Sequence, residues 1–258
     1  AGLGALIYTG GMPFNLTYPW VLAGKGVIDI IGTPDGSCKY ASTVWGLEDK
    51  PVIAVRPVNH PGVHVGKSVW RGTNAILSWS WQGWEGNKAE IEVYSDAEAV
   101  ELRLNGRSLG KKKIRDCKAM FKARYASGAL VAVAYAADGK ELGRNELHSA
   151  SGGLSVQVKP EAAEVRVGDI VHVPVTIEGE NGVVEANADC RLTVRVEGGE
   201  LLAFGSANPC TEEQYHTGVF TTCHGRALAV IRAGQPGTIA VKVQDGTRCA
   251  ETAITVKP

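Results

Sequence analysis

The chain has 258 residues, and its 27 lysines and arginines balance its 27 aspartates and glutamates, so its formal net charge is zero. Affinity for nucleic acid comes mainly from neutralised phosphates, and a balanced chain is a poor candidate for that class of partner. No stretch approaches the roughly 20 apolar residues of a membrane-spanning helix, and the first residues lack the basic segment of a signal peptide. We therefore expect a globular protein of one large or two small domains, with neither nucleic acid nor a membrane as partner.

The spacing of the cysteines argues against a metal or redox site. The six cysteines are dispersed and none forms a C-x-x-C pair, so neither a zinc knuckle nor a redox dithiol is encoded. Three disulfides are an open alternative, although a domain of this size does not need them. Scattered thiols favour a reducing compartment such as the bacterial cytoplasm, and a periplasmic or secreted location stays open. We expect no metal and no cofactor.

The first 57 residues are rich in glycine, proline and aromatic side chains and show little alternation. One helix is predicted there, from Ser37 to Trp45, with Ser37 as its N-cap. Cys38, Ala41 and Trp45 would share one face of this helix. A piece of this size with one short helix is a poor independent domain, so we interpret it as the edge of something larger.

From Ala89 onward, apolar residues alternate with polar ones, which is typical of half-buried β-strands. Ile91 and Val93, for example, lie opposite Glu90 and Glu92. This period of two continues to the end of the chain, and no later stretch has a convincing helical period. The region is therefore predicted to be all β.

Two hairpin turns are encoded in this region. Asn105-Gly106 and Asp138-Gly139 each follow an alternating run, and asparagine and glycine both tolerate the positive φ of a type I′ turn. A basic run, Lys111–Lys113 with Arg115, comes just after the first turn. We interpret it as a solvated strand edge whose lysines discourage pairing with other chains, and polyanion binding is the alternative.

The alternation breaks at residues 149–153 (SASGG), which is the best domain boundary in the sequence, and then resumes. The longest one-faced strand follows, with Val171, Val173, Val175 and Ile177 on one side. Pro174 has no N–H to give to a sheet, so this strand is predicted to lie at a sheet edge or at a bulge. The pattern as a whole predicts two consecutive β-sandwiches.

All six tryptophans fall within the first 84 residues, and three of them form a tryptophan cluster of Trp79, Trp81 and Trp84. On a strand, Trp79 and Trp81 would point to the same face. Exposed, the cluster would be a platform that stacks on sugar rings; buried, it would anchor one domain against its neighbour. Its position, where irregular sequence meets alternating sequence, favours burial. The side chains that would bond sugar hydroxyls in the first case are Asn74, Gln82 and Asn87.

Several stretches of the sequence are familiar: residues 18–32 (YPWVLAGKGVIDIIG) with Tyr40 and Val44-Trp45-Gly46, Trp79-Ser80-Trp81 with residues 90–113 (EIEVYSDAEAVELRLNGRSLGKKK), residues 201–209 (LLAFGSANP), Phe220, and residues 225–234 (GRALAVIRAG). Together they resemble glycoside hydrolase family 2, which includes the β-galactosidases. The resemblance covers nearly the whole chain, in the order expected for the end of a catalytic barrel, an immunoglobulin-like domain and a last β-sandwich.

The resemblance implies a mainly β chain of three parts. Residues 1–57 would be an irregular, short-helical remnant of the (β/α)8 catalytic barrel with its linker, residues 58–150 the first immunoglobulin-like β-sandwich, and residues 151–258 the second. In this family two glutamates on earlier barrel strands cleave the glycosidic bond with retention, one as acid/base and one as nucleophile. No position here matches either motif, so no catalytic residue is assigned.

These expectations predict a non-catalytic accessory region that braces the barrel, shapes the rim of its active site or mediates oligomerisation. The expected partner is the barrel, with an oligosaccharide and a second copy of the chain as alternatives. Three rival hypotheses are a carbohydrate-binding module built on the tryptophan cluster, an independent enzyme and a spacer module. If the first segment normally packs on a barrel, Phe14, Tyr18, Trp20 and Trp45 lose part of their cover, which would favour self-association.

Overall fold

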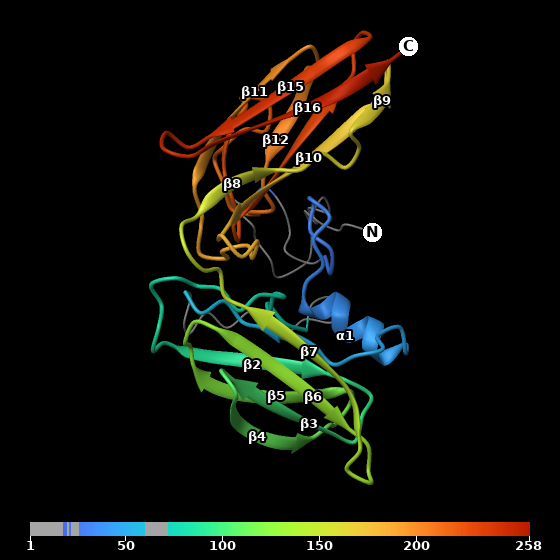
Figure 1. The fold of residues 1–258 in the computed structure, drawn as a ribbon, viewed down its shortest axis with the longest axis vertical. Coiled ribbons are helices and arrows are strands. Elements are labelled where there is room, and N and C mark those ends of the chain that lie inside the picture. Colours follow the sequence, from blue (N-terminus) through green and yellow to red (C-terminus); the bar gives the residue numbers. More distant parts are fainter. Residues whose placement is uncertain (1–17, 20, 22–25, 60–71) are drawn as a thin grey trace. The chain divides into compact units, whose positions relative to one another are not determined.

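The computed structural model describes residues 18, 19, 21, 26–59 and 72–258. The chain divides into two compact units (Figure 1). Unit 1 contains Gly24–Ser149, and unit 2 contains Ala150–Pro258 together with the described residues that precede Gly24. In the described ranges, no helix is long and apolar enough to cross a membrane.

Unit 1 contains two antiparallel sheets, with the orders β1-β2-β5 and β4-β3-β6-β7. Its elements are α1 (Gly36–Val44), β1 (Val52–Val55), β2 (Lys88–Tyr94), β3 (Ala99–Leu104), β4 (Arg107–Lys113), β5 (Lys118–Arg124), β6 (Ala129–Tyr135) and β7 (Glu141–His148). The alternation of the sequence produces the core, since Ile91, Val93, Val100, Leu102 and Leu130 all have no exposed surface. The prediction of a β-sandwich is confirmed here.

The turn between β3 and β4 has the predicted form. Asn105 and Gly106 have φ values of 50° and 81°, as a type I′ turn requires. The Asn105 side chain fixes the turn, because its Oδ1 accepts the N–H of Ala129 at 2.8 Å and its Nδ2 donates to the carbonyl of Ser127 at 2.9 Å. The following basic residues, Lys111–Lys113, lie on β4 at the edge of its sheet, as predicted.

The helix α1 exists where it was predicted, but its cap and its buried face are different. Asp35, and not Ser37, is the N-cap, because its carboxylate accepts the backbone N–H groups of Ser37 at 2.8 Å and Cys38 at 3.0 Å. The predicted face is also wrong, since Ala41 and Trp45 are exposed.

The helix instead approaches the sheet through its first residue. A Cβ atom at Gly36 would lie 2.9 Å from the Tyr94 hydroxyl and 2.9 Å from the carbonyl oxygen of Ala75, so only glycine fits there. One turn later, the ring of Tyr40 packs edge-on against the ring of Tyr94, with 5.5 Å between their centroids. Close approach at Gly36 therefore decides which face is inside, and the apolar spacing of the sequence did not reveal it.

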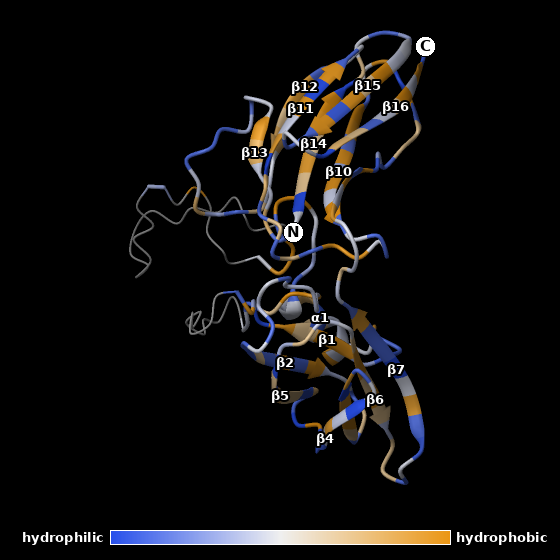
Figure 2. Cartoon of the chain, turned by 60° about the vertical axis from the view of Figure 1, so that its left-hand side comes forward, coloured by the Kyte–Doolittle hydropathy of each residue, from blue (hydrophilic) through white to orange (hydrophobic). Residues whose placement is uncertain are grey.

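Unit 2 is also a sandwich of two sheets, with the orders β12-β14-β10-β8 and β13-β11-β15-β16-β9. Its strands are β8 (Ser155–Val158), β9 (Glu164–Arg166), β10 (Ile170–Glu178), β11 (Arg191–Glu197), β12 (Glu200–Gly205), β13 (Val219–Thr221), β14 (Arg226–Arg232), β15 (Gly237–Gln244) and β16 (Cys249–Lys257). Hydrophobic and hydrophilic residues alternate along these strands (Figure 2), and the apolar members of both sheets form one core cluster.

The prediction for β10 is right about its alternation and wrong about its place. The four inward residues, Val171, Val173, Val175 and Ile177, are at most 2% exposed. However, β10 lies between β14 and β8 and is an interior strand. Pro174 fits because β8 has ended at this point. The carbonyl of Pro174 faces the side of β8 and accepts the N–H of Lys159 at 3.1 Å. The N–H that proline lacks would face that side too, where the regular pairing with β8 has stopped.

The cap of α1 gives a test of this local structure. We expect Asp35→Ala to lower the free energy of unfolding by about 1 kcal/mol, because two N–H groups of the first turn lose their acceptor. Urea denaturation followed by tryptophan fluorescence measures the loss. Ser37→Ala is the matched control and should change the free energy by less than about 0.5 kcal/mol, since the Ser37 hydroxyl has no hydrogen-bond partner among the described residues. Equal losses in the two variants would contradict the assignment of the cap.

Candidate functional site

The tryptophan cluster lies in the connection between β1 and β2 and not on a strand. Trp79 and Trp81 have no exposed surface. Both rings contact the ring of Tyr125 edge to face, at centroid distances of 5.0 Å and 6.0 Å. The three rings therefore form an aromatic core within unit 1.

Hydrogen bonds tie this aromatic core to the end of unit 1. The indole N–H of Trp79 donates to the carbonyl of Ala126 at 3.1 Å, and the backbone N–H of Trp81 donates to the Tyr125 hydroxyl at 2.9 Å. The hydroxyl of Ser149 donates to the carbonyl of Trp79 at 2.5 Å. The last residue of unit 1 is thus bonded to the first residue of the cluster.

This burial determines what the cluster can do in the described structure. A ring with no exposed surface presents no face for a sugar, so Trp79 and Trp81 act in packing. Trp84 is partly exposed. The sugar-binding role of the cluster stays a prediction.

Apolar surface is exposed at the end of α1. Val44, Trp45 and Leu47, which we call the α1 apolar surface, are 49%, 78% and 69% exposed. In unit 2, Tyr18 is 72% exposed. The expected exposure of Tyr18 and Trp45 is therefore confirmed. The two other residues of that prediction, Phe14 and Trp20, lie outside the described residues.

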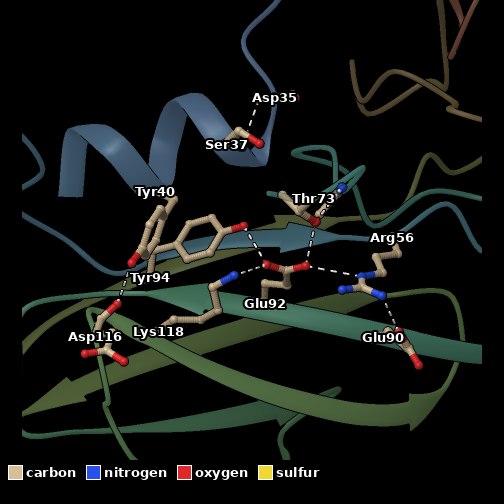
Figure 3. A network of polar contacts seen from close by, with 11 residues as sticks. Asp35, Ser37, Tyr40, Arg56, Thr73, Glu90, Glu92, Tyr94, Asp116 and Lys118 are labelled. Carbon is tan, nitrogen blue, oxygen red and sulfur yellow. Dashed lines mark hydrogen bonds and ion pairs between the residues drawn. The ribbon is translucent and has the colours of Figure 1, made fainter. Parts of the chain in front are cut away.

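A buried carboxylate is the centre of a polar network in unit 1 (Figure 3). Glu92 lies on β2 with no exposed surface, and its two oxygens accept hydrogen bonds from four groups. Its Oε1 accepts from the Thr73 hydroxyl at 2.6 Å and from Nε of Arg56 at 3.2 Å. Its Oε2 accepts from Nζ of Lys118 at 2.9 Å and from the Tyr94 hydroxyl at 3.0 Å.

The sequence places Glu92 on the polar face of β2, opposite Ile91 and Val93, and that expectation is wrong. The strand is central in its sheet, and its final four residues are all buried, so both of its faces are covered there. The neighbouring Glu90, one period earlier, stays partly exposed and pairs with Arg56 at 2.9 Å. Alternation alone cannot distinguish these two glutamates, because it records residue type and not what covers the second face.

The network keeps Glu92 ionised. Burial by itself raises the pKa of Glu92, but hydrogen bonds from Thr73, Lys118 and Tyr94 and the charge of Lys118 outweigh it and hold the pKa below its ordinary value of 4.5. Burial, followed by the charge of Glu92, raises the pKa of Tyr94 far above its ordinary range. Glu92 is therefore an anion and Tyr94 a neutral donor throughout the physiological pH range.

This arrangement stabilises the fold and is poorly suited to catalysis. A catalytic carboxylate must reach a substrate atom, whereas both oxygens of Glu92 are already bonded. A hollow of about 240 Å³ beside the network is lined by Ser37, Tyr40, Gly72, Thr73 and Lys118. Two of those groups, the Thr73 hydroxyl and the Lys118 ammonium, are bonded to Glu92. Among the described residues, no group of three or more histidines, cysteines, aspartates and glutamates is placed to hold a metal ion.

Both units match models of known domains. Residues 86–143 match a domain of unknown function, DUF4982, and residues 154–253 match the glycoside hydrolase family 2 C-terminal domain 5. Residues 154–253 thus carry a C-terminal domain of glycoside hydrolase family 2. The first match runs from just before β2, which carries Glu92, into β7, and the second covers most of unit 2.

Relatives of this family cover nearly the whole chain. The β-galactosidase BoGH2A of Bacteroides ovatus is 23% identical over 91% of this chain and 26% of its own length. A glycosyl hydrolase family 2 member from Bacteroides cellulosilyticus has a solved structure that is 28% identical, with a TM-score of 0.81 over 93% of this chain and 32% of that one. A β-glycosidase from Bacteroides vulgatus, 22% identical with a TM-score of 0.72, shares the fold over 93% of this chain and 29% of its own. The chain thus spans between a quarter and a third of the length of these relatives.

The buried carboxylate yields a prediction about stability. We expect Glu92→Gln to lower the free energy of unfolding by about 2–4 kcal/mol at pH 7, because Lys118 and Arg56 lose their anion and one oxygen becomes an amide donor. Denaturant unfolding measures the loss. The matched control is Glu90→Gln on the same strand, for which we expect a loss of at most about 1 kcal/mol, since that glutamate is partly exposed.

The wild type and the Glu92→Gln variant also test how this contribution to stability depends on pH. A carboxyl whose pKa is lower in the folded state contributes stability above its unfolded pKa, and this contribution is lost as the pH falls through the folded value. The difference between wild type and Glu92→Gln should therefore shrink as the pH falls below 4.5, the ordinary value for glutamate. A difference that grows in acid would mean that Glu92 is protonated in the folded protein.

Proposed function

We propose that this chain is a non-catalytic accessory region of a β-galactosidase-like glycoside hydrolase, and that the whole protein hydrolyses β-glycosidic bonds with retention. The observation that carries the proposal is the match of residues 154–253 to a C-terminal domain of glycoside hydrolase family 2. A relative that shares this region is a β-galactosidase, of which the chain spans 26%. The rest of such a protein has room for the catalytic barrel.

The chemistry of retention supports this division of labour. A retaining glycosidase needs two carboxyl groups about 5–5.5 Å apart on either side of the scissile bond. In this proposal both glutamates lie on barrel strands that precede the segment present here. The buried Glu92 has no exposed surface and four hydrogen-bond donors around it, so it does not supply such a group.

Exposed apolar side chains support the barrel as the partner. The α1 apolar surface belongs to the segment that resembles the end of the barrel, and Trp45 within it is 78% exposed. Apolar groups that gather on a surface mark sites of contact with other protein. In this proposal the barrel covers that surface, and the two sandwiches brace the barrel, shape its rim or join subunits.

A turnover assay tests the proposal. We expect the purified chain to hydrolyse a chromogenic β-galactoside no faster than buffer, with the whole Bacteroides ovatus β-galactosidase as positive control. Saturable turnover by this chain would contradict the accessory role. Titration with lactose, followed by tryptophan fluorescence, covers the rival hypothesis, because a saturable change that Trp84→Ala abolishes would assign the chain to carbohydrate binding.

The α1 apolar surface gives a second test. We expect the chain alone to self-associate as its concentration rises, because contact between copies would remove apolar area from water at about 25 cal/mol per Å². Sedimentation of the wild type and of a Trp45→Ser, Leu47→Ser double variant measures this, and the variant should remain a monomer at higher concentration. Leu142→Ser is the control, since Leu142 is 56% exposed on β7. A wild type that stays monomeric at high concentration would count against the apolar surface as a contact site.

A further inference from the structure

The connection between β12 and β13, residues 206–218, is held in shape by its own side chains. The Asn208 side chain accepts the N–H of Cys210 at 3.0 Å, and the Thr211 hydroxyl accepts the N–H of Glu213 at 3.0 Å. The Glu213 carboxylate accepts both the N–H and the hydroxyl of Thr221, at 3.0 Å and 2.9 Å. This connection, which we call the 206–218 loop, is therefore anchored to β13.

Aromatic packing fixes the other side of the same loop. Tyr215 stacks on Phe220, with ring centroids 4.9 Å apart and planes inclined by 16°, and its carbonyl accepts the N–H of Phe204 at 2.7 Å. A Cβ atom at Gly205 would lie 2.2 Å from Cδ1 of Tyr215, so the ring lies directly against the backbone of β12. These contacts fix the end of the loop that carries Tyr215 against β12 and Phe220.

Two backbone groups in the middle of the loop bond to a distant part of the chain. The N–H of Thr211 donates to the carbonyl of Pro19 at 2.9 Å, and the N–H of Val21 donates to the carbonyl of Pro209 at 2.8 Å. These bonds have the antiparallel pattern in which one loop residue, here Cys210, lies between them. Proline has no N–H, so Pro19 can offer only its carbonyl, which is what this register requires.

We propose that the 206–218 loop is a docking edge for another segment of this chain, which it holds through the main-chain groups of Pro19 and Val21. The interaction is the addition of a short strand, in which main-chain hydrogen bonds give the affinity. It deepens the proposed function and rests on it in one respect: residues 19–21 fall in the stretch that resembles the end of the barrel. Unit 2 is then the part of the chain that holds Pro19 and Val21.

The test removes one main-chain donor from the segment and none from the sandwich. Val21→Pro deletes the N–H that bonds to Pro209, and Val21→Ala is the matched control that keeps it. Amide hydrogen exchange of the full chain follows Thr211, whose N–H bonds to Pro19. We expect its exchange to rise about fivefold or more in Val21→Pro, which is the loss of one net hydrogen bond, and to stay near wild type in Val21→Ala.

Two results would overturn the proposal. Equal exchange at Thr211 in wild type and Val21→Pro would mean that the segment is not docked. An equal rise in both variants would mean that the Val21 side chain, and not the main chain, makes the contact. The amides of β14 report whether the sandwich itself is intact and should be unchanged in both. None of these outcomes depends on galactoside hydrolysis, so failure of the docking edge is distinguishable from failure of the proposed function.

Discussion

Unit 1 depends on the neutralisation of one buried negative charge. Removing a carboxylate from water costs several kcal/mol unless partners replace the lost hydration. Glu92 therefore requires Arg56, Thr73, Tyr94 and Lys118 at the same time, and these residues come from the end of β1, the connection to β2, β2 itself and β5. The irregular sequence before β2 is held against the sandwich by this requirement, together with the close contact at Gly36.

The features of this chain are of two kinds, those that hold each unit together and those that make contacts beyond it. The network, the buried tryptophans and the two sandwich cores hold the units together. The exposed apolar residues at the end of α1 are free for contact with other molecules, and the main-chain groups of the 206–218 loop bond to Pro19 and Val21 of this chain. Both involve the stretch that resembles the end of a barrel, although one belongs to unit 1 and the other to unit 2. An accessory region would have its contact groups in that stretch.

The sequence predicts those parts of the structure that depend only on residues close together in the chain. Asn105-Gly106 specified its turn, because positive φ is a property of those two residues. The alternation in β10 specified its inward face. What failed depends on long-range neighbours: Pro174 is interior because β8 ends beside it, and Glu92 is buried because its second face is covered. The network could not be predicted, since Arg56 and Lys118 lie far from Glu92 in sequence and show no spacing that links them.

The burial of Trp79 and Trp81 also makes unit 1 optically distinct. Indoles in an apolar environment emit at shorter wavelength than hydrated ones, and these two lie against Tyr125 with no exposed surface. Residues 150–258, which make up the whole sandwich of unit 2, contain no tryptophan. The short-wavelength part of the emission, which comes from Trp79 and Trp81, therefore reports on the aromatic core of unit 1, while circular dichroism reports on both sandwiches. The two sandwiches of one unlabelled chain can be followed separately as they unfold.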